Sequence, residues 1–403
     1  MSIDEQQRGF GTRAIKAATR APRVEQRPAA VPIYQSATFH AQDVDDYAEL
    51  VGFERPGYTY SRLENPTAEA MAGAFAELHG AEAGFAFGSG MGAIHATLLS
   101  LVRAGDRIVS TRAVYGSTRA LMERVLRTLG VEIVFVDPVD LEAVERELSA
   151  APTAVLYAET ISNPTIVVAD LARLAELAHA HGAKLVVDNT FASPFLCTPL
   201  ELGAYVVVES ATKWLSGHSD VVAGVVAGTR EFIDRVRDVA IDTGGIVSPF
   251  AAFLVLRGLQ TLHVRMDRHS STAVALARQL ESAPVVANVA YPGLPSHPQA
   301  EIAQRELRRG GGMLAMELPS RAAAAAFIDN LTIPPVTATL GSVVTYAVHP
   351  PTATHRQLDD AQLAECGIPQ GLVRISVGLE DVDDLLADMA GALMAAMEAG
   401  LSA

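Results

Sequence analysis

Short apolar runs alternate with amphipathic stretches along most of the chain, beginning near residue 67. The apolar runs are rich in Val and Ile, which is typical of strands buried on both faces of a parallel sheet. Strands are predicted over residues 84–87, 108–111, 131–137, 154–159, 185–188, 205–209 and 221–227. Helices are predicted over residues 68–79, 118–129, 141–148 and 171–181, with one more ending at 103. This alternation predicts an α/β fold with a mostly parallel sheet covered by helices on both faces.

The last third of the chain follows a different pattern. A long helical stretch over residues 251–282 precedes separated strands at 313–318, 336–340 and 372–377, and a closing helix is predicted at 383–399. This order predicts a smaller C-terminal α+β domain. We therefore expect a large domain over residues 67–255 and a second domain over residues 256–403.

The first 66 residues show no sustained helical or strand period and contain several prolines. They also contain aromatic residues, which are scarce in disordered tails. We interpret residues 1–66 as an extended arm that packs on a neighbouring subunit.

Composition narrows the classes of function. The chain has 403 residues, of which 49% are hydrophobic and 19% charged, as is typical of a globular protein. Its net charge of −15 disfavours binding to nucleic acid or to an anionic membrane surface. We find no secretory signal, no apolar stretch long enough to span a bilayer, and no metal-binding spacing of His or Cys. We therefore expect a cytoplasmic protein without a metal site.

A glycine-rich segment, GSGMG at residues 88–92, lies between a predicted strand and a predicted helix. Glycines there let backbone N–H groups approach a phosphate, and the helix dipole adds a favourable field. With Ala93 the segment also fits a dinucleotide-binding pattern. That pattern needs an acidic residue at the end of the next strand, which ends instead in Ser110, Thr111 and Arg112. The segment therefore indicates a phosphate site, and by itself the signal is weak.

Two further residues follow buried strands. Asp188 ends the strand at 185–188, where open α/β sheets bind ligands, although an aspartate there can equally cap the next segment. Lys213 follows the strand at 205–209, after Ser210 and Thr212. A lysine in this position is usually exposed, but a buried one has a lowered pKa and can bind an aldehyde covalently.

Together, a phosphate cradle, a carboxylate for a ring nitrogen and a lysine for an aldehyde are the groups that pyridoxal phosphate requires. The chain resembles the cystathionine γ-synthase, cystathionine γ-lyase and methionine γ-lyase family of fold-type I pyridoxal-phosphate enzymes along nearly its whole length. The matching segments are YTYSRLENPT (58–67), GSGMG (88–92), VYG (114–116), ETISNP (159–164), VDNTF (187–191), SATK (210–213), SGHSD (216–220), YPGLPSHP (291–298) and RISVGLED (374–381).

The resemblance implies a role for each matching residue. Lys213 would bind the cofactor covalently and transfer protons, Asp188 would hold the protonated ring nitrogen, and Tyr115 would stack on the ring and assist proton transfer. Arg374 would bind the substrate carboxylate with help from Asn163. The residues implied to hold the phosphate are Gly90, Met91, Ser210, Thr212 and, from the neighbouring subunit, Tyr60 and Arg62. The implied assembly is a homotetramer built as a dimer of dimers, with sites shared across each dimer.

Three positions distinguish the substrates within this family. Members that act on cystathionine often carry Glu, a basic residue and Glu at the positions of Thr59, Ala120 and Val344. Charges there suit the distal ammonium and carboxylate of cystathionine, which a thioether lacks, and unpaired buried charges are costly. With Thr59, Val344 and Thr345 lining the substrate site, we expect γ-elimination on L-methionine.

Other activities remain open at this point. Methionine γ-lyases typically carry Cys where this chain has Ser117. Cystathionine γ-lyase, cystathionine γ-synthase and γ-replacement on an O-acylhomoserine are the alternatives. A scaffold that binds the cofactor without turnover is disfavoured, because Lys213 is present and no DNA-binding segment is visible.

Overall fold

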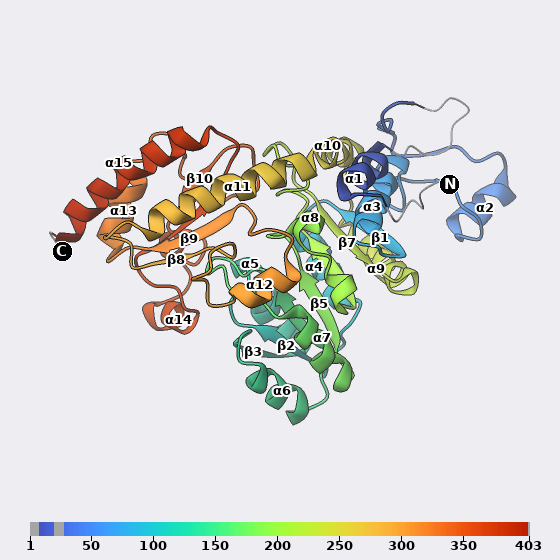
Figure 1. Cartoon of the computed structure of the whole chain (residues 1–403). Coiled ribbons are helices and arrows are strands. Elements are labelled where there is room, and N and C mark those ends of the chain that lie inside the picture. Colours follow the sequence, from blue (N-terminus) through green and yellow to red (C-terminus); the bar gives the residue numbers. More distant parts are fainter. Residues whose placement is uncertain (1–7, 20–27, 402–403) are drawn as a thin grey trace.

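A computed structural model of the chain describes residues 8–19 and 28–401 and contains two separate β-sheets (Figure 1). The larger sheet has seven strands in the order β1-β7-β6-β5-β4-β2-β3. Strands β2 to β6 pair in parallel, and β7 runs antiparallel to both β6 and β1. The strands are β1 (Ala83–Phe87), β2 (Arg107–Thr111), β3 (Glu132–Val136), β4 (Val155–Glu159), β5 (Lys184–Asp188), β6 (Val206–Glu209) and β7 (Gly224–Gly228). The prediction of a mostly parallel sheet is confirmed.

Helices cover both faces of this sheet, because successive strand residues point to opposite faces and both sets are apolar. Val187 and Val207 belong to one buried cluster, whereas Val186 and Val206 belong to another. Residues of α3 (Pro66–Leu78), α6 (Leu141–Ala150) and α7 (Leu171–Ala180) join the first cluster. Residues of α4 (Gly90–Leu99) and α9 (Arg230–Thr243) join the second.

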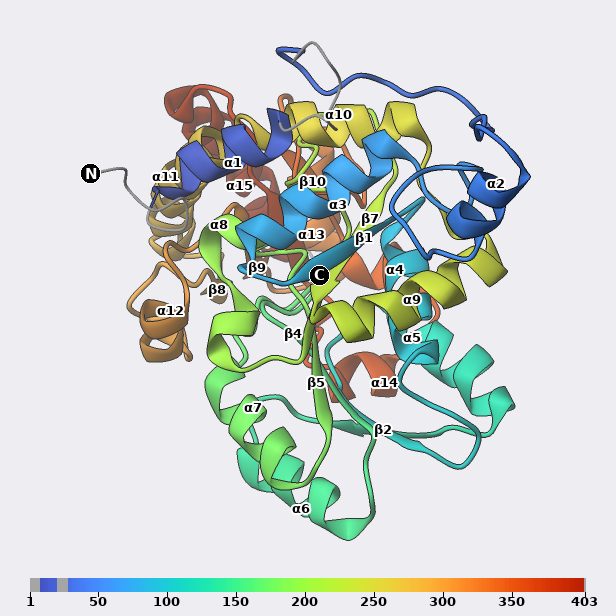
Figure 2. The same cartoon turned by 90° about the vertical axis from the view of Figure 1, so that its right-hand side faces the viewer.

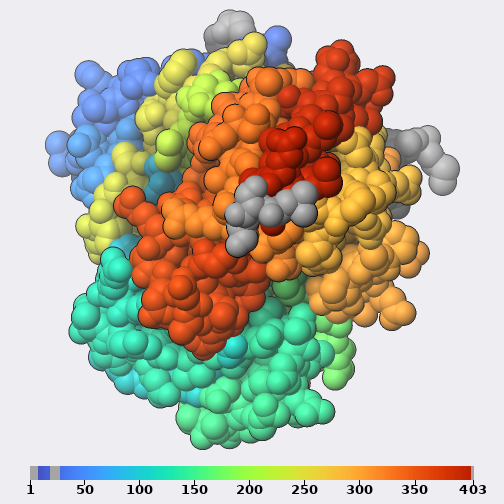
Figure 3. Space-filling view, turned by 90° about the vertical axis from the view of Figure 1, so that its left-hand side faces the viewer, coloured from blue at the N-terminus to red at the C-terminus, as the bar shows by residue number. Residues whose placement is uncertain are grey.

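The smaller sheet is antiparallel, in the order β10-β11-β9-β8. Its strands are β8 (Asn288–Ala290), β9 (Met313–Glu317), β10 (Tyr346–Val348) and β11 (Leu372–Ser376). Apolar residues of α11 (Leu262–Glu281), α13 (Arg321–Asp329) and α15 (Val382–Leu401) share a buried cluster with these strands. Figure 3 shows the orange and red C-terminal part lying against the green and cyan residues of the larger part. This is the α+β arrangement that the sequence predicted, so the fold class is confirmed.

The longest helices, α11 and α15, have 20 residues each. Within the described ranges, no helix combines the length and the apolar character needed to cross a membrane. The helical stretch predicted over 251–282 is divided at Gln260 and Thr261 into α10 (Pro249–Leu259) and α11. The helix predicted over 118–129 begins as α5 (Gly116–Leu121) and continues as a π-turn and a 3₁₀-turn.

One predicted strand is wrong. Residues 336–340 form no strand, and only Val336 makes an isolated bridge, to Ala347. The carbonyls of Ala338 and Thr339 instead accept hydrogen bonds from Arg374, so this backbone is not available for a strand ladder. The prediction also missed β8, β10, α8 (Ser193–Leu196), α12 (Ala300–Glu306), α13 and α14 (Asp360–Glu365).

The N-terminal segment contains two helices that its sequence pattern did not predict, α1 (Phe10–Thr19) and α2 (Val44–Val51). Helix α1 packs against α3 and buries Phe10 and Ala14, with the Phe10 ring edge-on to Phe195, and its small alanines gave little apolar signal. Helix α2 extends to one side of the chain, and Val44 and Tyr47 on it are 84% and 51% exposed (Figure 2). Residues 1–7 and 20–27 of the predicted arm lie outside the described residues. The domain division at residue 255 falls within α10 and stays a prediction.

Candidate active site

The candidate catalytic residues lie at the carboxyl ends of neighbouring parallel strands. Asp188 is the last residue of β5, Glu159 is the last residue of β4, and Lys213 follows β6. Parallel strands end at the same edge of a sheet, which is where open α/β folds bind ligands. Arg374 reaches this edge from β11 of the smaller sheet. The site is therefore built from both sheets.

Lys213 is largely buried, and its Nζ lies 3.2 Å from Thr339 Oγ1. Burial, together with the positive charge of Arg374, lowers the pKa of Lys213 to about 8. A buried ammonium is disfavoured because it loses its hydration, so an appreciable fraction of the amine is neutral near neutral pH. The neutral amine is the form that attacks an aldehyde.

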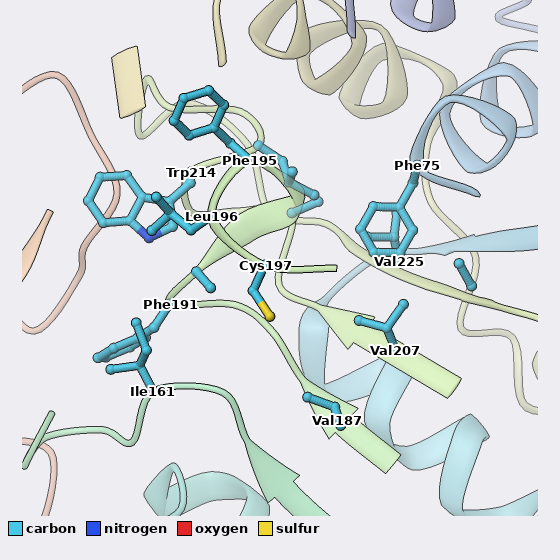
Figure 4. Packing of buried hydrophobic residues seen from close by; sticks show 14 of the residues in the cluster. Phe75, Ile161, Val187, Phe191, Phe195, Leu196, Cys197, Val207, Trp214 and Val225 are labelled. Carbon is cyan, nitrogen blue, oxygen red and sulfur yellow. The ribbon is translucent and has the colours of Figure 1, made fainter. Parts of the chain in front are cut away.

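The backbone after Lys213 is held in the core. The guanidinium of Arg265 donates to the carbonyls of Trp214 and Gly258, at 2.8 Å each. The Trp214 ring is buried in the cluster that also contains Leu196 and Phe191 (Figure 4). The buried Trp214 ring and the hydrogen bonds from Arg265 to the backbone together restrict the position of Lys213.

The glycine-rich segment forms the N-terminus of α4. Ser89 caps this helix by accepting from the N–H of Gly92, and Gly90 is the first helical residue. A Cβ on Gly90 would lie 2.7 Å from Cβ of Ser210, so Gly90 and Ser210 are in close contact. The Thr212 hydroxyl exchanges hydrogen bonds with the backbone of Ala223. The structure thus brings Gly90, Met91, Ser210 and Thr212 to one place, at a helix N-terminus suited to a phosphate.

Asp188 is buried, with Oδ1 accepting from the N–H of Thr190 at 2.9 Å. The Tyr157 hydroxyl lies 3.4 Å from Oδ2 and donates to it. Burial raises the pKa of Asp188, while the hydrogen bonds from Thr190 and Tyr157 oppose that rise. A carboxylate in this position can accept a hydrogen bond from a protonated ring nitrogen.

Arg374 is a buried cation without a carboxylate partner among the described residues. Its Nη1 donates to Asn163 Oδ1 at 2.7 Å and its Nη2 donates to Ala338 O at 2.7 Å. Its buried Nε has no hydrogen-bond partner in the described part of the chain. Burial lowers the pKa of Arg374 to about 10. A guanidinium left in this state favours an anionic ligand such as a carboxylate.

Tyr115 lies close enough to Arg374 to raise the pKa of that guanidinium, and the residue is 39% exposed. Its backbone N–H donates to Glu159 Oε1 at 2.6 Å, and the N–H of Asn163 donates to Oε2 of the same carboxylate at 3.0 Å. Burial and the charge of Asp188 raise the pKa of Glu159 well above its usual range. An exposed aromatic side chain near Arg374 suits stacking on a planar ring.

The remaining predicted site residues have other surroundings within one chain. Arg62 Nη1 donates to Ile241 O at 2.7 Å, and the Tyr60 side chain is 41% exposed. Thr59 is buried, and its carbonyl accepts from the N–H of Phe39. The Thr345 hydroxyl donates to Glu380 and accepts from the N–H of Gly378, and the preceding residue, Val344, is partly buried. The roles of these residues remain predictions.

The sequence did not point to several residues that contact the predicted ones or their neighbours: Thr339, Tyr157, Thr190, Arg265 and Glu159. For Glu159 a signal was available. It is a carboxylate that ends a buried apolar strand, as Asp188 does, and the two are paired across β4 and β5. Thr339 and Arg265 carry no such signal, because they contact Lys213 and its neighbour from distant parts of the chain.

These groups fit pyridoxal phosphate: a lysine of lowered pKa, a buried carboxylate, an open aromatic face and a close-packed helix N-terminus. Residues 11–394 match the family described as Cys/Met metabolism PLP-dependent enzyme. The chain belongs to this family. It is an enzyme, and pyridoxal phosphate is its cofactor.

Individual relatives cover nearly the whole chain. An L-methionine γ-lyase of Pseudomonas putida is 43% identical over 96% of this chain and 98% of its own length. An O-succinylhomoserine sulfhydrylase of Pseudomonas aeruginosa is 40% identical over 96% and 95%. The crystal structure of cystathionine γ-lyase from Lactobacillus plantarum, complexed with L-serine, has a TM-score of 0.90 and 34% identity and covers 97% of this chain and 100% of its own.

We expect Gly224→Ala to weaken cofactor binding. A Cβ at Gly224 would lie 2.2 Å from the Ser89 carbonyl oxygen, so the glycine-rich loop must shift. Such overpacking typically lowers the free energy of unfolding by about 1–3 kcal/mol. The control is Gly73→Ala in α3, where a Cβ would meet no atom within 4 Å. This substitution should stabilise the helix by about 0.5–1 kcal/mol, because alanine loses less conformational freedom on folding than glycine. Urea unfolding measures the free energy of unfolding of both variants, and titration with pyridoxal phosphate measures their affinity for the cofactor. Unchanged cofactor affinity in Gly224→Ala would contradict this account of the cradle.

We expect the rate of covalent cofactor capture by the apo enzyme to rise with pH and to level off above about 8, the pKa of Lys213. The reason is that deprotonation gives the neutral amine, which is the nucleophile. Visible absorbance after mixing with pyridoxal phosphate measures the rate. Arg374→Met removes a positive charge that lowers this pKa, so its profile should move to higher pH. A wild-type midpoint near the 10.5 of an ordinary lysine would contradict the burial argument.

Proposed function

We propose that this enzyme is an L-methionine γ-lyase, which converts methionine and water to 2-oxobutanoate, ammonia and methanethiol. The observation that carries the proposal is the lack of an ionisable side chain at three positions, Thr59, Ala120 and Val344. The nearby Arg119 does not replace the missing base, since its Nε donates to Glu123 and its guanidinium lies over the Phe135 ring. The methionine γ-lyase relative of Pseudomonas putida supports the same activity.

In this reaction each residue of the candidate active site would have its own role. Arg374 and Asn163 hold the substrate carboxylate, which fixes the amino acid in one orientation. Lys213 Nζ, once released from the cofactor, removes the proton from the substrate Cα and returns protons later. The Tyr115 hydroxyl transfers a proton toward the departing sulfur. Pyridoxal phosphate, when bound, supplies the electron sink for negative charge at Cα, and Asp188 keeps its ring nitrogen protonated.

The alternatives are other reactions at the γ carbon. Cystathionine γ-lyase, cystathionine γ-synthase and an O-acylhomoserine γ-replacement enzyme would use the same Lys213, Asp188 and Arg374. Ser117 stands where methionine γ-lyases typically have Cys, which keeps γ-replacement as the second candidate. The O-succinylhomoserine sulfhydrylase relative is the observation that favours it.

We further propose that the enzyme works as a homotetramer in the cytoplasm, built as a dimer of dimers. Tyr60 and Arg62 would bind the cofactor phosphate of the neighbouring subunit. The support is that Arg62 in its own chain contacts the backbone of α9, at Ile241, while Tyr60 stays exposed. Exposed apolar residues on α2, such as Val44, suit burial against a second chain.

The substrate is tested by measuring 2-oxobutanoate release from methionine, cystathionine, homocysteine and O-acetylhomoserine side by side. We expect kcat/KM for methionine to exceed that for cystathionine by about tenfold or more, because no charged partner meets the distal groups of cystathionine. Lys213→Ala should abolish release from every substrate and lose the covalently bound cofactor. A kcat/KM that is highest by far for cystathionine would show that the missing charges do not set specificity.

Shared sites are tested by mixing two inactive variants, Lys213→Ala and Arg62→Ala. A mixed dimer contains one site with both native residues, so random exchange of subunits should restore up to about a quarter of wild-type activity. The measurement is methanethiol release after dissociation and reassociation of the mixture. If no activity returns although mass spectrometry shows mixed dimers, the two residues serve the same subunit's site.

A further inference from the structure

One buried carboxylate connects two walls of the candidate active site. Glu159 Oε1 accepts from the Tyr115 N–H at 2.6 Å, and its Oε2 accepts from the Asn163 N–H at 3.0 Å. The Asn163 side chain in turn accepts from Arg374 at 2.7 Å. Hydrogen bonds therefore run without a break from the residue that stacks on the ring to the residue that binds the substrate carboxylate.

Tyr115 and Asn163 depend on this link because neither lies within a strand or helix. Tyr115 stands between β2 and α5 as the N-cap of that helix, and its side chain makes no capping hydrogen bond. Asn163 lies in the loop after β4. Backbone N–H groups outside regular structure need another acceptor when they are buried, and here one carboxylate accepts from both.

A carboxylate is a costly choice for this purpose. Glu159 is buried and forms no ion pair with a described residue, and Asp188 adds a second negative charge nearby. A neutral glutamine side chain has one oxygen and cannot accept at both ends, whereas the two oxygens of a carboxylate can. The need for two acceptor oxygens at a fixed spacing explains why a carboxyl group, and not an amide, is buried there.

We propose that Glu159 is a positioning residue that sets Tyr115 relative to the Asn163–Arg374 clamp, and so links substrate binding to proton transfer. The proposal rests on the function proposed above, because it takes the roles of Tyr115, Asn163 and Arg374 from it. Glu159 itself touches neither substrate nor cofactor and acts through two backbone amides.

The chain contains a matched control in Glu306. Its Oε2 accepts from the Leu171 N–H at 3.0 Å and its Oε1 from the Ala172 N–H at 3.3 Å. This carboxylate also joins two backbone amides, at the start of α7 and away from the site, and its Oε1 in addition pairs with Arg305 Nη2 at 2.8 Å. Glu306→Gln therefore reports what the loss of such a bridge, together with one ion pair to an exposed arginine, does to stability away from the site.

The experiment compares Glu159→Gln and Glu306→Gln with the wild-type holoenzyme. In Glu159→Gln the amide NH₂ faces one of the two N–H donors. Either Tyr115 or Asn163 then loses its hydrogen-bond acceptor, and its backbone shifts. We expect the affinity for L-alanine, followed by the visible absorbance of the cofactor, to fall by about tenfold, the effect of one lost hydrogen bond to a charged group. We expect kcat with methionine to fall by about tenfold to a hundredfold for the same reason.

Glu306→Gln should lower Tm about as much as Glu159→Gln does, while leaving alanine affinity and kcat within about twofold of wild type. Adding Glu159→Gln to Asn163→Ala should weaken alanine binding no further than Asn163→Ala alone, because the two act through one contact. If Glu159→Gln lowers only Tm, as Glu306→Gln does, or if its effect adds fully to that of Asn163→Ala, the proposal is wrong.

L-Alanine has no γ substituent, so its binding tests the link independently of the methionine reaction. A wild type that binds alanine but releases no 2-oxobutanoate from methionine overturns the proposed function and leaves the alanine test intact. Should Glu159→Gln fail to fold, hydrogen exchange in the wild-type apo enzyme decides. Slow exchange at the Tyr115 and Asn163 amides supports the link, and exchange as fast as in exposed loops overturns it.

Discussion

The site brings together two cationic side chains, a buried Arg374 and a largely buried Lys213, and the rest of the site is arranged around them. Lys213 and Arg374 are close enough for Arg374 to lower the pKa of Lys213, and neither forms an ion pair with a described carboxylate. In a medium of low polarity this arrangement is unfavourable unless ligands supply the missing negative charge. A phosphate and a substrate carboxylate, the ligands proposed above, would do so, and a covalent bond between Lys213 and the cofactor would also remove the free ammonium. Such a site is less stable without its ligands, and the apolar cores of the two sheets stabilise the fold against this cost in free energy.

Keeping Lys213 in place requires contact between the two sheets. The loop after residue 336 brings Thr339 to the lysine, and Gly341 lies against its backbone, where a Cβ would be 2.7 Å from the Trp214 nitrogen. From the other side, Arg265 of α11 holds the carbonyl of Trp214. The smaller sheet therefore contributes to the lysine's surroundings and also supplies Arg374, and a relative movement of the two sheets would alter both.

The sequence predicted the parts of the site that local patterns determine. Buried strands ending in Asp188 and leading to Lys213 were visible as apolar runs followed by a polar residue, and Gly90 stood at a strand–helix junction. It did not predict the loop at 336–340, which has the composition of a strand but whose carbonyls accept from Arg374. It also missed α13, an alanine-rich helix whose apolar pattern is weak, although its Phe327 is buried in the core of the smaller sheet.

By itself, the sequence determined the α/β class and the order of the strands along the chain, and it predicted which residues carry the chemistry, since hydrophobic periodicity and motif spacing are local properties. Only the tertiary structure decided how those residues act together. Thr339 and Lys213 are 126 positions apart, and Arg374 and Asn163 are 211 positions apart. Their contacts depend on how two sheets pack, and packing also creates the burial that lowers the pKa of Lys213. A chain's local pattern does not contain that information, because burial is a property of the assembled fold.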